Sequence, residues 1–283
     1  MQPGGQHFPV HILADDKFRD HCGIFAVYGN DEAARLAYHG LYALQHRGQE
    51  SAGIAVTDGN VITCHKAMGH VADIFTERVL EELVGRAAIG HTRYSTAGDT
   101  ILKNAQPLVV SCQKGQVALA HNGNLVNAAA LRRELESRGD IFQTSSDTEV
   151  IVHYFARSKQ SGLPEAVADA LDHVQGAYSL VMLFKEAVYG IRDPHGFRPL
   201  SLGTLGEPPE QAWVLASETC AFDLIGARFV RDIEPGQMVI LDKRGPTFLS
   251  FAPPQPKQCI FEHVYFSRPD SVVFGRSVQA SRE

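Results

Sequence analysis

A cysteine stands at the head of a short apolar segment near the start of the chain. Cys22 is followed by the β-prone residues Gly23–Tyr28, whereas residues 1–21 are largely polar. An apolar run of this length predicts a buried strand, since strands in globular proteins usually span 3–10 residues. We therefore expect a sheet with Cys22 at its edge, preceded by a leader that does not fold on its own.

The position of Cys22 would give it an unusual chemistry if the leader were removed at the His21–Cys22 bond. A free thiol has a pKa near ~8.5 and needs a base to become a good nucleophile. An α-amine has a pKa of about 7.7–8.0, which suits proton transfer at neutral pH. One residue would then carry both groups. The alternative is that Cys22 is a small buried strand residue, which is the common state of a lone cysteine.

Composition and charge exclude several function classes. At 283 residues and 44% hydrophobic content, the chain can bury the core of one large or two modest domains. The net charge of −6, with scattered Lys and Arg, gives no footprint for nucleic acid or for an anionic membrane. No apolar run approaches the roughly 20 residues that span a bilayer. We expect no nucleic-acid or membrane partner.

The leader and the cysteines indicate the cellular compartment in which the protein works. Residues 1–21 contain three aspartates and no long apolar region, so we interpret them as a propeptide or disordered arm, not a secretory signal. The five cysteines are odd in number and include no Cys-x-x-Cys pair. This pattern favours reduced thiols in the cytoplasm and predicts neither a disulfide framework nor a zinc site.

Helical and strand patterns alternate in a way that predicts an α+β layered domain. Helices are expected over 33–44, 71–84, 127–139, 146–155 and 163–173, with Asn127 as an N-cap and Ser146 with Glu149 as a capping box. Strands are expected over 51–56, 61–64, 87–92, 107–111, 117–120, 178–184, 187–191, 199–202, 213–216 and 237–241. No Gly-x-Gly-x-x-Gly or Walker motif indicates a nucleotide-binding βαβ unit.

Four loops at predicted strand ends carry polar groups that could act on a small polar substrate. They are Arg47-Gly48-Gln49, His91-Thr92-Arg93, His121-Asn122-Gly123-Asn124 and Ser145-Ser146-Asp147. Each has a structural alternative: Asn-Gly is a common tight turn, Arg93 could form a surface ion pair, and Asp147 could favour a helix N-terminus.

Together with Cys22, these loops resemble the class II glutamine amidotransferases, which are N-terminal-nucleophile hydrolases that release ammonia from glutamine. The similarity is carried by Cys22–Ala26, Leu44–Gly53, Gly90–Thr96, His121–Asn124 and Ser146–Glu149, in that order. It implies a four-layer αββα sandwich of the N-terminal-nucleophile hydrolase type over residues 22–252.

Two segments, one of them within Leu44–Gly53, are similar to the amidophosphoribosyltransferase family. They are Gln45–Glu50 and Cys259–Ser271. This similarity implies the glutamine-hydrolysing half of an enzyme that makes 5-phosphoribosylamine from phosphoribosyl pyrophosphate and glutamine, the first committed step of de novo purine synthesis.

The resemblance implies a role for each matching residue. Cys22 would attack the glutamine amide, with its α-amine as the proton carrier. The Asn122 side chain and the Gly123 N–H would bind the oxyanion. Arg93 would pair with the glutamine α-carboxylate and Asp147 with its α-ammonium, and Arg47 with Gly48 would line the nucleophile.

The last part of the chain departs from the complete family pattern. Residues 253–283 are expected to be a linker and the start of a phosphoribosyltransferase domain whose pyrophosphate- and magnesium-binding motifs are not in the sequence. We therefore expect a fragment or a partner chain, with no cofactor within this chain. The complete enzyme would be expected to use Mg and to form a homo-oligomer. Cys259 matches one ligand of a four-iron cluster found in the subgroup with a cleaved propeptide, but it cannot hold a cluster alone.

Two other functions remain open at this point. A thiol hydrolase could use His91 or His121 as its base, and a non-catalytic module could bind glutamine without hydrolysing it. A globular domain whose polar loops are only well-capped turns is also open, and it predicts that millimolar glutamine leaves thermal stability unchanged.

Overall fold

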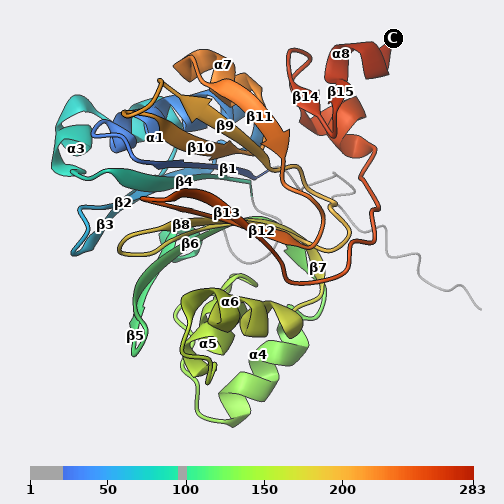
Figure 1. The fold of residues 1–283 in the computed structure, drawn as a ribbon. Coiled ribbons are helices and arrows are strands. Elements are labelled where there is room, and N and C mark those ends of the chain that lie inside the picture. Colours follow the sequence, from blue (N-terminus) through green and yellow to red (C-terminus); the bar gives the residue numbers. More distant parts are fainter. Residues whose placement is uncertain (1–21, 95–100) are drawn as a thin grey trace, which may run out of the picture.

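Two stacked antiparallel sheets lie between two layers of helices in the computed structural model, which describes residues 22–94 and 101–283 (Figure 1). The four-layer αββα sandwich and the α+β class predicted from the sequence are confirmed. The predicted leader, residues 1–21, lies outside the described residues, as do Ser95 and Thr96.

The first sheet has seven strands within the described part of the chain. Their order is β11 (Arg228–Asp232), β9 (Ser201–Leu205), β10 (Ala212–Ala216), β1 (Gly23–Tyr28), β4 (Ala87–Arg93), β2 (Ser51–Thr57) and β3 (Ile62–Met68). Its outer face is covered by α1 (Ala33–Ala43), α2 (Val71–Ile74), α3 (Glu77–Glu82) and α7 (Cys220–Ile225) (Figure 1). β1 is therefore a central strand, paired on both sides.

The second sheet has six strands among the described residues. Their order is β13 (Gly245–Ser250), β12 (Gln237–Asp242), β8 (Val188–Arg192), β7 (Gly176–Leu183), β6 (Gly115–Leu125) and β5 (Leu108–Cys112). Three helices cover its outer face: α4 (Ala128–Ser137), α5 (Glu149–Arg157) and α6 (Leu163–Asp172) (Figure 1).

The space between the sheets is filled by small and branched apolar side chains. Ile24 and Ala26 of β1 meet residues such as Ala118 and Ala120 of β6, and all four are completely buried. Because side chains alternate across a strand, the neighbours of these residues face the helices, as Phe25 does. The alternation fixes which face of each strand points into the interlayer.

The C-terminal segment packs against the end of the first sheet. It has no regular secondary structure at Pro253–Pro256 and continues into η3 (Glu262–Phe266, a π-helical turn), β14 (Val272–Val273), β15 (Arg276–Ser277) and α8 (Val278–Arg282). Figure 1 shows it in red beside β11 and α7. The domain boundary after residue 252 stays a prediction. No described helix is long and apolar enough to cross a membrane.

Several local predictions differ from the structure. His91–Arg93 and His121–Asn124, expected as loops at strand ends, lie within β4 and β6. The single helix expected over 71–84 is broken into α2 and α3, because Phe75 turns into the core beside the rings of Tyr38 and His65. Asn127 caps no helix with its side chain, which instead bonds to His173 O and Gln175 N. The predicted capping box is wrong, because Glu149 accepts hydrogen bonds from the backbone of Gln143 and Thr144.

Candidate active site

Cys22 lies directly ahead of β1 and is 8% exposed. Its Sγ is 3.5 Å from the carbonyl oxygen of Tyr94, the residue that follows β4. β1 and β4 pair antiparallel with Gly23 opposite Thr92, so one further step of the register places Cys22 across from Arg93. The predicted nucleophile and the predicted carboxylate-binding arginine are therefore cross-strand neighbours.

Polar side chains replace apolar ones at one end of the interlayer. Along each strand, the residues that face the interlayer are apolar over most of its length and polar at this end. These are Cys22 ahead of β1, His91 and Arg93 of β4, Asn122 of β6, Ser179 of β7 and Ser217 after β10. A polar site at this end is thus enclosed by both sheets.

Asn122 of β6 in the second sheet faces this site from the opposite side, and Gly123 follows it on the same strand. Asn122 is 1% exposed, and its Nδ2 donates to Ser217 Oγ at 3.3 Å. Gly123 has a φ of 146°, and a Cβ there would lie 2.0 Å from the carbonyl oxygen of Ala177. The position therefore requires glycine on both conformational and steric grounds.

Gly48 holds the predicted Arg47–Gly48 loop against Arg93. A Cβ on Gly48 would lie 2.6 Å from the Arg93 carbonyl carbon, and the Glu50 N–H donates to Arg93 O at 3.1 Å. Because Gly48 has an extended backbone with φ of −172°, close approach alone demands a glycine here. The loop thus sets the backbone position of Arg93.

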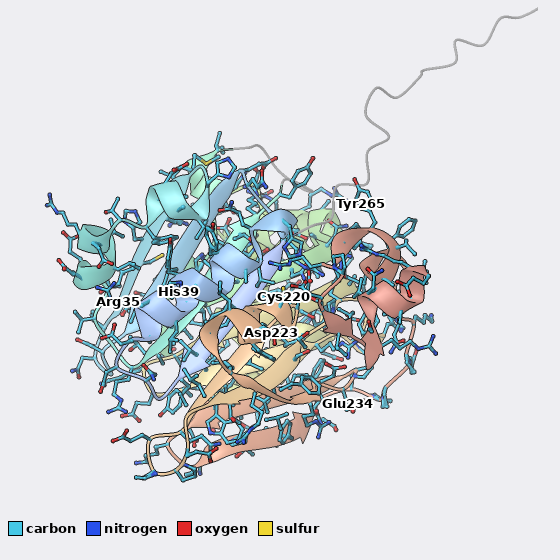
Figure 2. The ribbon with its side chains drawn as sticks, turned by 90° about the horizontal axis from the view of Figure 1, so that it is seen from above. Arg35, His39, Cys220, Asp223, Glu234 and Tyr265 are labelled. Carbon is cyan, nitrogen blue, oxygen red and sulfur yellow. The ribbon has the colours of Figure 1, made fainter. Side chains whose placement is uncertain are left out.

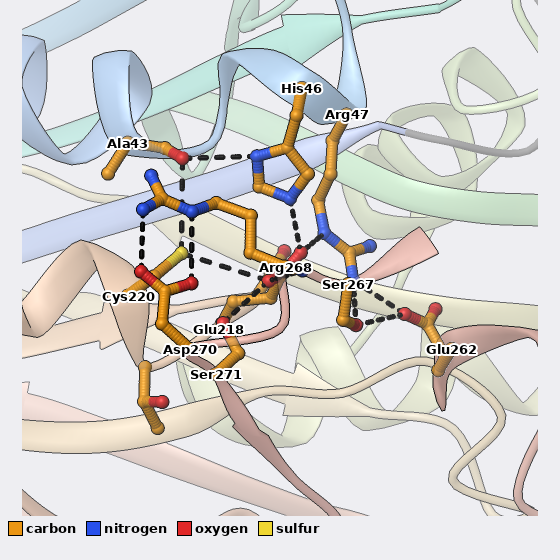
Figure 3. A network of polar contacts seen from close by, with 12 residues as sticks. Ala43, His46, Arg47, Glu218, Cys220, Glu262, Ser267, Arg268, Asp270 and Ser271 are labelled. Atoms are coloured by element: carbon orange, nitrogen blue, oxygen red, sulfur yellow. Dashed lines mark hydrogen bonds and ion pairs between the residues drawn. The ribbon is translucent and has the colours of Figure 1, made fainter. Parts of the chain in front are cut away.

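The Arg47 guanidinium lies in a buried ion network (Figure 3). Its Nε bonds to Glu218, and its Nη2 donates to Glu262 Oε2 at 2.5 Å and to Ser267 Oγ at 2.9 Å. Burial alone would lower the pKa of Arg47, but the two carboxylates raise it above its ordinary value. The side chain therefore joins the loop to the C-terminal segment, and any role beside Cys22 falls to the Arg47–Gly48 backbone.

Glu218 is the centre of this network and was not predicted from the sequence. Its carboxylate accepts from His46 Nε2 at 2.8 Å, from Arg268 N at 2.9 Å and from Ser271 Oγ at 2.7 Å (Figure 3). Burial would raise its pKa, but Arg47 and the other donors lower it, so Glu218 is ionised at neutral pH. Its isolated place in the sequence gave no signal of this role.

Cys220 sits beside this network but differs from Cys22. Its Sγ is 3.9 Å from the carbonyl oxygen of Ala43, at the end of α1, and Figure 2 shows it in the helical layer. Burial and the nearby Glu218 carboxylate raise its pKa to about 12. A thiol held protonated in this way is a poor nucleophile.

Asp147 lies ahead of α5 and is bonded to the end of β6. Its Oδ2 accepts from Leu125 N at 2.9 Å, and its Oδ1 accepts from Thr148 Oγ1 at 3.3 Å. The side chain is 13% exposed. The carboxylate is thus fixed in place by the strand and the helix start, with part of its surface accessible to a ligand.

The two candidate histidine bases lie in different surroundings. His91 is 1% exposed, its Nε2 lies 3.0 Å from His121 O, and burial lowers its pKa to about 3. Its predicted use as a base is therefore unfavourable, because a general base works best with a pKa near the operating pH. His121 faces away from Asn122 along the strand, and its Nδ1 lies 3.0 Å from Thr148 Oγ1.

Cys259 is half-buried and lines a cavity of about 700 Å³ together with Asn124, Tyr178, His195 and Arg198. Among the described residues, no group of three or more His, Cys, Asp or Glu side chains is placed to hold a metal ion. The described residues therefore do not fit an iron–sulfur cluster, which needs four ligands.

Comparison with known proteins points to one family. The profile of the glutamine amidotransferase domain family matches residues 91–223. The chain is 50% identical over 282 residues to amidophosphoribosyltransferase 2, chloroplastic, of Arabidopsis thaliana, covering 97% of this chain and 50% of that protein. It is 44% identical to the amidophosphoribosyltransferase of Bacillus subtilis, covering 96% of this chain and 57% of that protein.

Solved structures agree with this comparison. The B. subtilis glutamine phosphoribosylpyrophosphate amidotransferase, complexed with ADP and GMP, superposes with a TM-score of 0.87 at 44% identity. The match covers 92% of this chain and 56% of that one. The chain thus spans about half the length of the curated relatives it matches.

Proposed function

Since this chain carries a glutamine amidotransferase domain of the amidophosphoribosyltransferase type, we propose that it hydrolyses free glutamine to glutamate and ammonia with Cys22 as the nucleophile. The observation that carries the proposal is the convergence of both sheets on one polar site. Cys22 lies across from Arg93, and the Asn122 amide is hydrogen-bonded to a serine that also binds the Cys22 strand.

The reaction would follow from these positions in two steps. The Cys22 sulfur attacks the amide carbon of glutamine, and the thiol proton passes to the α-amine freed by removal of residues 1–21. Collapse of the tetrahedral intermediate breaks the carbon–nitrogen bond, and the same amine returns the proton to the leaving ammonia. Water then hydrolyses the thioester, releasing glutamate and restoring the thiol.

Binding groups would select free glutamine over peptide amides. The Asn122 Nδ2 and the Gly123 N–H would stabilise the oxyanion, a contribution worth about 10²–10³ in rate for one such donor. Arg93 would take the α-carboxylate and Asp147 the α-ammonium. A site with two charged partners rejects ligands that lack either charge.

We extend the proposal to the use of the ammonia. In a protein that also carries the transferase half, the ammonia would aminate phosphoribosyl pyrophosphate, with Mg bound there, in an assembly of several copies. Cleavage of a propeptide and a cytoplasmic location belong to the proposal on sequence grounds. A cluster ligated by Cys259 would need three ligands from outside the described residues.

The test is ammonia release together with the mass of the active protein. We expect Cys22→Ala to abolish glutaminase activity. Cys64→Ala is the matched control: Cys64 lies on β3, its pKa is raised to about 11 by burial, and its loss should leave activity unchanged. Intact-mass analysis should show Cys22 as the first residue. An active protein with residues 1–21 still attached would refute the amine mechanism, and calorimetric glutamine binding without ammonia release would indicate a binding module.

A further inference from the structure

We propose that Ser217 is a positioning residue that orients the Asn122 amide toward the reacting carbonyl, an inference that rests on the proposed function. Ser217 is completely buried and follows β10 directly. Its Oγ accepts one hydrogen bond from Ile24 N at 3.0 Å and another from Asn122 Nδ2 at 3.3 Å. One hydroxyl therefore links the Cys22 strand in the first sheet to the predicted oxyanion donor in the second.

The position of this hydroxyl is fixed by its own backbone. Ser217 N donates to Ile24 O at 3.1 Å, while Ser217 Oγ accepts from Ile24 N. The serine thus binds both backbone groups of Ile24 and lengthens the pairing of β1 with β10 by one residue. Ile24 is two residues from Cys22, so the oxygen is held at a set place relative to the thiol.

An asparagine needs such an anchor to serve as an oxyanion donor. The amide carries an acceptor oxygen and a two-hydrogen donor nitrogen on the same carbon. A half-turn about the last side-chain bond would exchange them and aim the oxygen at the developing negative charge, which is repulsive. With one Nδ2 hydrogen on Ser217, the nitrogen is held on the side of the Cys22 strand and the second hydrogen can reach the oxyanion.

The residues after Ser217 keep it from shifting. Glu218 binds the buried Arg47 and the Arg268 N–H, and Thr219 Oγ1 accepts from Val272 N at 2.8 Å. Consecutive side chains therefore attach the same turn to the Cys22 strand and to the C-terminal segment. No proton or covalent bond changes at Ser217, so its effect should be on the geometry of the amide alone.

The experiment compares Ser217→Ala with the unaltered chain in steady-state glutamine hydrolysis. We expect kcat to fall about 10- to 100-fold, which is less than the loss expected when an oxyanion donor is removed completely. The KM for glutamine should change less than about 2-fold. Asn122→Ala should lose at least as much. The double variant should be no worse than Asn122→Ala, because Ser217 acts only through that amide.

Matched controls separate positioning from general damage. Ser201→Ala removes another buried serine hydroxyl, bonded to Asp232 on the neighbouring strand, and should leave kcat unchanged. Alkylation of Cys22 by iodoacetamide does not use the amide and should proceed within about 2-fold of the normal rate in Ser217→Ala. An unchanged kcat, additive losses in the double variant, or an equal loss in alkylation would each overturn the inference.

A readout that does not depend on turnover distinguishes this inference from the proposed function. The Asn122 side-chain NH₂ signals in protein labelled with ¹⁵N-asparagine can be assigned by their loss in Asn122→Ala. We expect both signals to shift in Ser217→Ala and not in Ser201→Ala. Unshifted signals would refute the positioning role, whereas an inactive unaltered chain with shifted signals would refute only the glutaminase proposal.

Discussion

At the scale of single residues, close backbone contact places the strictest demands on the site. Gly48 rests on the Arg93 backbone and Gly123 on the Ala177 carbonyl oxygen, at separations that no Cβ could occupy. Gly48 lies in the loop ahead of β2 of the first sheet, and Gly123 lies on β6 of the second. Each lies beside a side chain proposed to bind glutamine or the oxyanion. The geometry of the site therefore depends on these two glycines as well as on the polar side chains.

Gly48→Ala tests this demand. The added Cβ would overlap the Arg93 carbonyl, so the loop and the end of β4 must separate and displace the guanidinium. We expect KM for glutamine to rise at least about 10-fold, the effect of losing about 1.4 kcal/mol of binding. Gly59→Ala strains a hairpin turn with φ of 89° but adds no atom within 4 Å of any residue beyond its chain neighbours, so it is the control for backbone strain alone and should change KM little. An unchanged KM in Gly48→Ala would argue against Arg93 as the carboxylate site.

At the scale of elements, the sequence predicted what a periodic pattern can encode. Central strands such as β1 and β4 carry continuous apolar runs and were recognised, as was α1. Edge strand β11 was missed because Arg228–Asp232 is mostly exposed and pairs on one side only. β13 was missed for the same reason, and α7 is too short for its period to show.

The residues of the candidate site also fall into those that a sequence pattern predicts and those that it does not. Cys22, Arg93, Asn122, Gly123 and Asp147 belong to ordered motifs, so the resemblance selected them. The structure places Cys22, Arg93 and Asn122 at one end of the interlayer, with Gly123 next to Asn122 on β6 and Asp147 bonded to the end of that strand. Ser217 and Glu218 have no local pattern. The partners described above lie 50 to 193 residues away from them along the chain, and only the folded arrangement of the sheets reveals them.

The loop ahead of α5 supplies a pH prediction at this scale. Burial would raise the pKa of Glu149, but hydrogen bonds from His153 and from the N–H groups of Gln143 and Thr144 lower it to about 2. The ordinary pKa of this carboxyl group is 4.5, so as the pH falls the unfolded chain takes up the proton at a higher pH than the folded chain does. The stabilisation is complete above about pH 5 and is lost progressively toward pH 2.

Glu149→Gln should therefore lower the free energy of unfolding at pH 7 by on the order of 1–3 kcal/mol, the range for hydrogen bonds to a charged group. The difference from the unaltered chain should shrink between pH 6 and pH 3.5, as followed by urea unfolding. Glu136→Gln, on the exposed face of α4, serves as control. A difference that stays constant with pH would contradict the assignment.

At the scale of the whole molecule, the C-terminal segment contributes to the stability of the preceding sandwich. Glu262 shares its carboxylate between Arg47 and Arg198, and Arg268 and Ser271 bind Glu218. A chain ending at residue 252, the predicted domain boundary, would lose all of these partners. Arg47 and Glu218 would then be left with fewer counter-charges and donors.

We expect a chain of residues 1–252 to lose on the order of 3–5 kcal/mol of stability, since breaking a buried ion pair carries a penalty of that size. Thermal unfolding monitored by circular dichroism would measure it. A chain ending at residue 272 keeps these partners and should lose much less. Equal stability of both truncated chains would show that the network adds nothing.

The turn at Ser217–Thr219 has a mechanical consequence. Ser217 binds the strand that follows Cys22, and the adjacent Glu218 and Thr219 bind Arg268 and Val272. Moving those residues by about the length of one hydrogen bond would strain this turn or break its hydrogen bonds. We therefore expect the rate of the proposed glutamine hydrolysis to depend on the position of residues 268–272.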